Sequence, residues 1–231
     1  LSTTGMRTIV DGYEIVIYKT GENNSGENLD EIIKKRESKE DLIIMSDAST
    51  TNNPKKIKDQ KYIIHLFNCL VHARRQFEDV EKAYQEEAKK VKEWIGKIYH
   101  HESQAKEKSL SPEERLNWHQ ELSAPVMDDL KAWCDNAFPS KLVEPNSSLG
   151  KGIKYVLNHW EQLTGFLRVE GVSLDTNILE FHLRNQVMNR KNWLFFKTEK
   201  GAFISDIFSS IIKTCERGNE NPFEYLNALQ I

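Results

Sequence analysis

The chain has 231 residues, of which 39% are hydrophobic and 29% charged, and its formal net charge is −3. This composition is ordinary for a globular protein with one large or two small cores. The net charge argues against a uniformly basic nucleic-acid coat, although a local basic groove stays compatible with it. No run of about eighteen apolar residues indicates a membrane span, and the first residues lack the pattern of a signal peptide.

The cysteines favour a reduced, cytoplasmic setting, because Cys69, Cys134 and Cys215 are odd in number and far apart. Cys69 and His72 form a C-x-x-H pair, but a structural zinc site needs four ligands and no second pair is evident. The first residue is Leu1 instead of Met, which suggests that the segment is part of something longer.

The first 70 residues predict the order β-β-α-β-β, as expected of a mixed sheet with helices on it. Asp11-Gly12 stands between two β-prone runs and predicts a hairpin. Two later apolar runs have strand length, and their unbroken character predicts strands that are buried on both faces. The predicted strands are 7–10, 13–18, 42–45 and 62–67, with a short helix over 29–37.

From residue 71 the pattern becomes helical. Apolar residues recur at steps of three and four from Phe77 to Ile98, which predicts one long amphipathic helix. Ser111 and Glu114 form a capping box with a proline between them, so a helix begins there. Pro125 marks a kink or a restart. Further helices are predicted over 153–167, from 175 to 195, over 202–218 and in the tail.

Two carboxylates stand out by position. Asp47 ends the predicted strand 42–45, where ligands of open α/β sheets collect, but it could equally cap the turn at Ser49. Glu180 lies near the start of a helix and has two structural interpretations, a capping box with Asn177 and an ion pair with Arg184. An acid beside cations on one helix face also suits a metal-bound phosphate, so both interpretations stay open.

The second basic cluster comes directly after the strand predicted over 62–67. His72, Arg74 and Arg75 open a helix, where cations are mildly unfavourable with the helix dipole. That small cost suggests a role other than stability. A solvated helix end is the alternative.

These motifs resemble those of a known family. NCLVHARRQF is similar to the C-(W/L)-x-H-x-R-R-x-F element of the insertion-sequence-66 family of bacterial transposases. DTNILEFHLR and RKNWLF resemble that family's D-N-N-x-x-E-x-x-L-(R/K) and R-K-N-x-L-F elements. The similarity extends from about Gly5 to Leu229, with departures at Thr176, where Asn is frequent, and at Asn185, where Pro is common.

The resemblance implies a DDE transposase with an α/β, ribonuclease-H-like core that is interrupted by a helical insertion. In such enzymes three carboxylates bind two Mg²⁺ ions, or Mn²⁺, for DNA cleavage and strand transfer at insertion-sequence ends. By position, Asp47 corresponds to the second catalytic Asp and Glu180 to the catalytic Glu. The implied DNA contacts are His72, Arg74, Arg75, Arg184, Arg190 and Lys191. The implied parts are 1–70 and 151–231 for the core and 71–150 for the insertion, and a homo-oligomer without membrane contact is compatible with the family.

One part of the implied fold is missing. A ribonuclease-H-like sheet opens with three antiparallel strands, the first of which carries the first catalytic Asp, whereas this chain has only a hairpin before its first helix. Asp11, in the hairpin turn, is a poor substitute. We therefore expect a gap in the sheet and an inactive, truncated catalytic part. The alternatives are a non-catalytic DNA-binding or regulatory protein with the same fold, and a helical scaffold without a nucleic-acid role.

Overall fold

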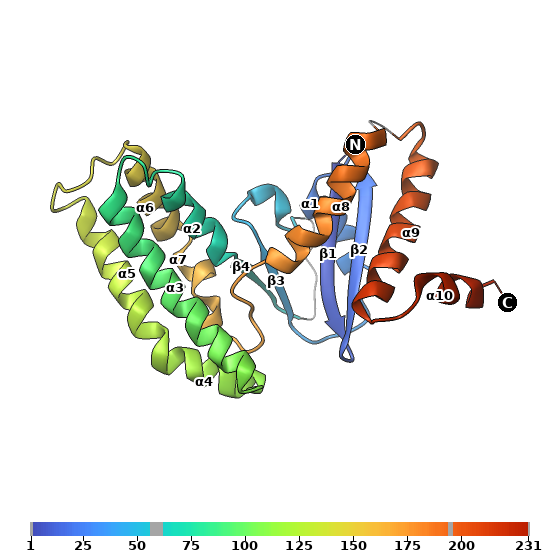
Figure 1. Ribbon diagram of the computed structural model, residues 1–231, viewed down its shortest axis with the longest axis horizontal. Coiled ribbons are helices and arrows are strands. Elements are labelled where there is room, and N and C mark those ends of the chain that lie inside the picture. The colour runs from blue at the N-terminus through green and yellow to red at the C-terminus, as the bar shows by residue number, and fades with distance from the viewer. Residues whose placement is uncertain (1, 56–61, 194–195, 231) are drawn as a thin grey trace. The chain divides into compact units, whose positions relative to one another are not determined.

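The computed structural model describes residues 2–55, 62–193 and 196–230, with the backbone alone at residues 2, 185–187 and 189–193. Within these residues the protein is mostly helical and has two small sheets (Figure 1). The strands are β1 (Ser2–Val10), β2 (Tyr13–Gly21), β3 (Leu42–Ser46) and β4 (Ile64–Asn68). The α-helices are α1 (Ser25–Ile33), α2 (Leu70–Glu78), α3 (Gln85–Glu107), α4 (Pro112–Leu122), α5 (Ala124–Ala137), α6 (Ser148–Asn158), α7 (Trp160–Leu163), α8 (Asn177–Trp193), α9 (Glu199–Arg217) and α10 (Pro222–Ala228). Two 3₁₀ turns, η1 (Thr50–Asn52) and η2 (Gly165–Leu167), complete the order.

The chain divides into two compact units. Unit 1 contains residues 1–38, 50–60 and 177–231, so it joins the N-terminal hairpin to the C-terminal helices. Unit 2 contains residues 39–49 and 61–176, so it joins β3 and β4 to the helices α2 to α7. The division into a catalytic core, 1–70 and 151–231, and an insertion, 71–150, stays a prediction.

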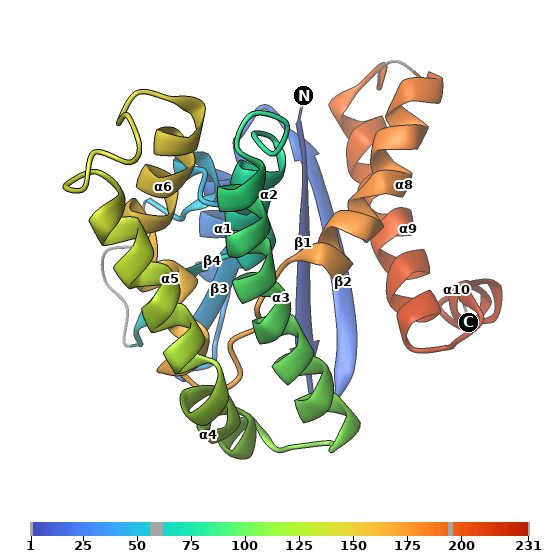
Figure 2. The same ribbon diagram turned by 60° about the vertical axis from the view of Figure 1, so that its left-hand side comes forward.

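Unit 1 is built around the predicted hairpin, which is confirmed. β1 and β2 pair antiparallel from Ser2 opposite Gly21 to Val10 opposite Tyr13, so both strands are longer than the sequence pattern indicated. Asp11 and Gly12 have φ values of 51° and 82°, the two positive values that a type I′ turn requires. Helix α8 packs on β1 and α9 on β2 (Figures 1 and 2).

Unit 2 contains the second pair of strands. β3 and β4 are parallel, with Leu42 opposite Ile64 and Ser46 opposite Asn68. The two predicted strands are therefore confirmed, but the prediction that both faces are buried is wrong for β3, because Ile43 is 38% exposed. A two-stranded sheet is narrower than the parallel sheets in which such apolar runs are fully covered.

The core of unit 2 lies among its helices and against β4. Phe67 from β4 packs closely on Gly165, where an added Cβ would lie 2.1 Å from the ring, so only glycine fits. The fully buried side chains include Phe77, Ile95, Ile98, Leu130, Leu149 and Ile153. These residues come from α2, α3, α5 and α6, and they form one hydrophobic cluster with Phe67 of β4.

Several predicted helix boundaries are wrong. The expected single helix over 77–98 is two helices, because α2 ends at Glu78 and α3 begins at Gln85. The helix expected over 153–167 ends at Asn158, where His159 takes a non-helical conformation. Helix α1 begins at Ser25, earlier than expected, because Asn24 and Glu27 form a capping box.

Other local predictions are confirmed. Ser111 and Glu114 form the predicted capping box at the start of α4, and α5 restarts next to Pro125. The β-β-α-β-β order of the N-terminal part is also present. Within the described ranges, no helix combines the length and the apolar character needed to cross a bilayer.

Candidate functional site

Two neighbouring strand ends form the centre of the candidate site. Because β3 and β4 are parallel and Ser46 lies opposite Asn68, the next residues, Asp47 and Cys69, leave the sheet at the same edge. The Cys69 backbone N–H donates to the Ser46 carbonyl at 2.9 Å, and the Asn68 side-chain amide donates to the Asp47 carbonyl at 3.3 Å. The edge of this sheet therefore holds both residues in fixed positions.

Asp47 has a defined side-chain orientation. Its Oδ1 accepts a hydrogen bond from the Ser49 backbone N–H at 3.1 Å, so the turn-capping interpretation is correct as far as this contact goes. The side chain is half-buried. Tyr155 lies close by: burial, together with the charges of Cys69 and Asp47, raises its pKa to about 12. The turn contact orients the Asp47 carboxylate at the strand end and is compatible with a ligand role.

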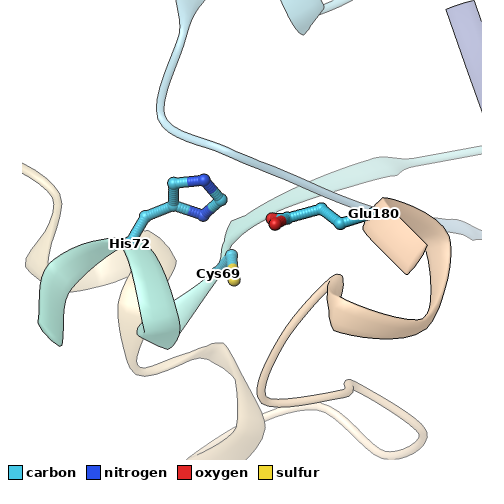
Figure 3. A group of neighbouring side chains, drawn as sticks. All are labelled: Cys69, His72 and Glu180. Carbon is cyan, nitrogen blue, oxygen red and sulfur yellow. The ribbon is translucent and has the colours of Figure 1, made fainter. Parts of the chain in front are cut away.

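Cys69 and His72 lie together at the start of α2 (Figure 3). The Cys69 sulfur and a ring nitrogen of His72 are within 4.8 Å of each other. Burial raises the pKa of the Cys69 thiol, but hydrogen bonds with His72 and Thr176 outweigh burial and lower that pKa overall. The Cys69 thiol therefore loses its proton more readily than the thiol of an ordinary buried cysteine. Figure 3 also draws Glu180, which belongs to unit 1.

The two arginines predicted beside this site follow on the same helix. Arg74 is half-buried and forms an ion pair with Glu78 at 2.8 Å. Arg75 is exposed, and its guanidinium lies 3.3 Å from Nε2 of His72. Unit 2 thus brings Asp47, His72, Arg74 and Arg75 onto one strand pair and the helix that follows it.

A segment that sequence reasoning missed, residues 172–176, is anchored to the same region of unit 2. The Leu70 N–H donates to the Leu174 carbonyl at 2.9 Å. Tyr99 donates its hydroxyl proton to Asp175 at 2.8 Å, and the Thr176 N–H donates to the Cys69 sulfur at 3.5 Å. Burial and the Asp175 charge raise the pKa of Tyr99, so this hydroxyl stays a donor. The segment that leads into α8 is therefore fixed beside the strand ends.

Glu180 lies in the first turn of α8, in unit 1, and is half-buried. Arg184, one turn later, is exposed. Arg190 and Lys191 lie in the helix, but their side chains are outside the described part of the chain.

Helix α8 is held by the hairpin of unit 1. An added Cβ on Gly5 would lie 2.5 Å from Cδ2 of Leu183 and 3.4 Å from Leu179, so glycine is what allows this close approach. The Tyr18 hydroxyl donates to the His182 carbonyl at 3.1 Å. These contacts fix the helix turn that follows Glu180.

Only part of the signal for the missed contacts was present in the sequence. Cys69 follows its strand as directly as Asp47 follows the other, and a parallel pairing brings the two residues to one edge. The anchoring contacts of Asp175 and Thr176 join positions far apart in the chain. The periodicity of apolar residues does not predict such contacts.

Comparison with known proteins identifies relatives. Residues 3–203 match the sequence model of the family described as "Transposase IS66 family". The uncharacterized protein y4jD of Sinorhizobium fredii is 32% identical over 164 residues, which are 71% of this chain and 31% of that relative. The uncharacterized protein y4hP of the same organism is 28% identical over 198 residues, 80% of this chain and 35% of the relative. The chain thus spans about a third of the length of these relatives, and no solved structure matches it.

Proposed function

This chain belongs to the IS66 family of transposases, and we propose that it supplies two of the three metal-binding carboxylates of a DDE-type, ribonuclease-H-like core that cuts and joins DNA. The proposal concerns the longer protein, since the chain spans about a third of its relatives. Its direct partners would be insertion-sequence ends and target DNA.

The observation that carries the proposal is the position of Asp47. It follows a strand of a parallel pair, its carboxylate is half-buried, and a backbone N–H orients one of its oxygens. Ligands of open α/β sheets collect at this edge, and carboxylate oxygens are the ligands that Mg²⁺ prefers. The Asp47 carboxylate therefore suits a hard divalent cation.

Chain connectivity supports Glu180 as the second ligand. Thr176 is anchored to Cys69, and Glu180 follows it by four positions in the sequence. Four residues span at most about 14 Å even when fully extended, and about 6 Å in a helix. Glu180 is therefore restricted to the neighbourhood of the segment 172–176, whatever direction the helix takes.

In this proposal Asp47 and Glu180 would hold the metal, which when bound activates the attacking oxygen and stabilises the leaving oxygen of the phosphodiester. The chain's own residues orient and neutralise the DNA. Phosphate oxygens can accept hydrogen bonds from the side chains of Arg75, Arg184 and His72. Arg75 and Arg184 are exposed, so a DNA backbone can reach them. Arg190 and Lys191 belong to the same proposed set.

The small size of each sheet supports an incomplete core. Within the described residues, β1–β2 and β3–β4 are separate two-stranded sheets. In a ribonuclease-H-like fold the strand that carries the first Asp lies between these two pairs. The third carboxylate would then come from elsewhere in the longer protein, and the 231-residue chain alone would bind metal weakly and carry out no strand transfer.

Metal binding by the 231-residue chain tests the two ligands. We expect Mn²⁺ to raise the thermal midpoint of the chain, because a ligand at ten times its Kd stabilises the bound state by about 1.4 kcal/mol. Asp47→Ala and Glu180→Ala should each abolish this increase, whereas Glu170→Ala, at an exposed acid, should retain it. An increase that survives both substitutions refutes the assignment.

DNA binding separates the proposal from its alternative. A fluorescent duplex should bind with an affinity that falls steeply with salt, and Arg75→Ala together with Arg184→Ala should reduce that slope. Metal-independent binding by the chain, together with no cleavage by a longer protein that contains the missing strand, would instead favour a non-catalytic regulator. Cleavage by the longer protein that is lost in Glu180→Ala would support the transposase.

A further inference from the structure

Helix α9 of unit 1 is attached to the hairpin by its polar side. Along the outer edge of β2, alternate backbone N–H groups face no further strand among the described residues and donate to side chains of the helix. The three polar residues of the helix that accept these hydrogen bonds are spaced four apart, so they form one stripe of the helix. One of them, Asp206, is only 6% exposed. The pairs are Val16 with Thr214 at 3.1 Å, Tyr18 with Ser210 at 2.9 Å, and Thr20 with Asp206.

As a result, the apolar side of α9 faces away from its own hairpin. Two neighbouring rows carry large side chains with substantial exposure. Phe203 is 64% exposed and Ile207 41%, while Ile204, Phe208 and Ile212 are 43%, 48% and 38% exposed. An amphipathic helix in a monomer normally buries its apolar stripe. Large exposed apolar side chains grouped in this way mark an interaction surface.

One of these rows has a symmetric composition. Its residues, four apart, are Lys200, Ile204, Phe208, Ile212 and Glu216. Phe208 is at the centre, an isoleucine stands on each side, and opposite charges stand at the two ends. We call these five residues the Phe208 row. A two-fold rotation about Phe208 exchanges the two isoleucines and exchanges the positive end with the negative end.

We propose that the Phe208 row is a dimer contact, in which α9 packs antiparallel on α9 of a second copy of this chain. Phe208 then meets its own copy at the two-fold axis, Ile204 meets Ile212 of the partner, and each Lys200 meets a partner Glu216. Rows of residues four apart pack well against each other when helices cross at about −50°. The row satisfies the isologous rule that the same surface serves both subunits.

Charge decides the direction of the pairing. In a parallel pair the row would place Lys200 against Lys200 and Glu216 against Glu216, and both contacts are repulsive. In the antiparallel pair both end contacts join opposite charges. A second copy in antiparallel orientation is thus the occupant that this surface fits.

The charges permit a test by mixing two variants. Lys200→Glu alone opposes Glu to Glu at both ends of the dimer, and Glu216→Lys alone opposes Lys to Lys. In a mixed dimer of the two variants, every end contact joins opposite charges again. Both positions are exposed, and the ion pair that Glu216 forms with Lys213 at 2.5 Å lies on the surface of the same helix, so we expect the substitutions to leave the unit folded.

Sedimentation velocity over a concentration series measures the outcome. We expect the unmodified chain to dimerise, each variant alone to dimerise on the order of tenfold or more weakly, and the equimolar mixture to recover the original affinity. Phe208→Glu should abolish dimerisation, and Lys197→Glu, outside the row, should leave it unchanged. A mixture that stays as weak as its components refutes the antiparallel contact.

Two other results would also overturn the proposal. A chain that is monomeric at all concentrations would mean that another part of the longer protein, or a different partner, covers α9. A dimer that survives Phe208→Glu would use another surface. The test does not depend on metal or DNA, so its result is independent of the proposed transposase activity.

Discussion

Replacing Glu102 by Gln should destabilise unit 2 by about 3 kcal/mol at neutral pH. Glu102 is 6% exposed and lies in α3, where its carboxylate meets Arg115 at 2.7 Å and His119 at 2.9 Å. His119 is itself 1% exposed and is within 2.9 Å of the Ser123 hydroxyl, which is also buried. The carboxylate therefore joins α3 to α4 through a buried polar network.

The magnitude follows from the pKa of the carboxyl. Burial raises the pKa of Glu102, but hydrogen bonds with His119 and Arg115 and the charge of Arg115 outweigh burial and hold it at about 2, against 4.5 without the protein environment. At about 1.36 kcal/mol per pKa unit, this difference corresponds to roughly 3 kcal/mol for the ionised form. Gln resembles the protonated carboxyl in shape, so Glu102→Gln removes this contribution.

The same argument fixes the pH dependence. Because the folded pKa lies below the unfolded one, the stabilisation is fully present above pH 4.5 and is lost as the pH falls towards 2. The difference in unfolding free energy between the unmodified chain and the variant should therefore be constant near pH 7. It should shrink through this acidic window and approach zero at its lower end.

Urea unfolding followed by tryptophan fluorescence is the assay. Four of the five tryptophans lie in unit 2, so the signal reports mainly on that unit. Glu107→Gln is the matched control, because Glu107 lies on the same helix, is exposed and contacts Ser103. The control should change stability by less than about 0.5 kcal/mol. A difference for Glu102→Gln that is below about 1 kcal/mol, or that does not vary with pH, refutes the reasoning.

Three smaller changes test other contacts. Gly5→Ala should lower the thermal stability of unit 1 by about 1–3 kcal/mol, since the new Cβ would meet Leu183 at 2.5 Å. Tyr99→Phe should cost about 1–2 kcal/mol and increase amide hydrogen exchange in residues 172–176, because Asp175 loses a donor. Asp206→Asn should keep or raise stability at pH 7 in urea unfolding, because burial raises the pKa of this carboxyl and Asn keeps an acceptor for the β2 edge.

Each of these changes has a contrary outcome. An unchanged midpoint for Gly5→Ala would mean that α8 moves freely on β1. Unchanged exchange in Tyr99→Phe would mean that the other contacts of the segment suffice to hold it. A loss of stability in Asp206→Asn as large as that in Asp206→Ala would show that the charge itself is required at the β2 edge.

Local chemistry made part of the fold predictable. Asp11-Gly12 defines its turn because both residues adopt positive φ readily, and Ser111 with Glu114 defines a helix start through two reciprocal hydrogen bonds. The same signal was present at Asn24 and Glu27 and was overlooked. Such elements depend on neighbouring residues alone, so sequence contains all the information they need.

Tertiary packing decided the parts that sequence reasoning predicted wrongly. The break between α2 and α3 has no Gly or Pro, and the apolar period continues across it. Val80, in the break, packs against the core of unit 2, and Lys92 forms an ion pair with Glu81 at 2.6 Å. The two acids in the first turn of α3, Glu86 and Glu87, are the local sign of a new helix start.

The candidate site was predictable only in part, as the fold was. Asp47 could be found because the apolar run before it predicts a strand, and a strand end is a known position for ligands. The neighbouring position of Cys69 needed the parallel register, and the anchor at Thr176 needed a contact between residues 69 and 176. Neither follows from local pattern.

Because the chain divides into two units, the proposed site depends on the residues that hold the start of α8. Asp47 belongs to unit 2 and Glu180 to unit 1, and the segment 172–176 leads from one to the other. If both acids bind one metal pair, its geometry depends on how that segment and the hairpin contacts of α8 hold the helix start. Changes at Tyr99 or Gly5 would then weaken metal binding through the position of Glu180, although neither residue is a ligand. Residues that keep the segment in place would thus contribute to the proposed chemistry through the position of Glu180.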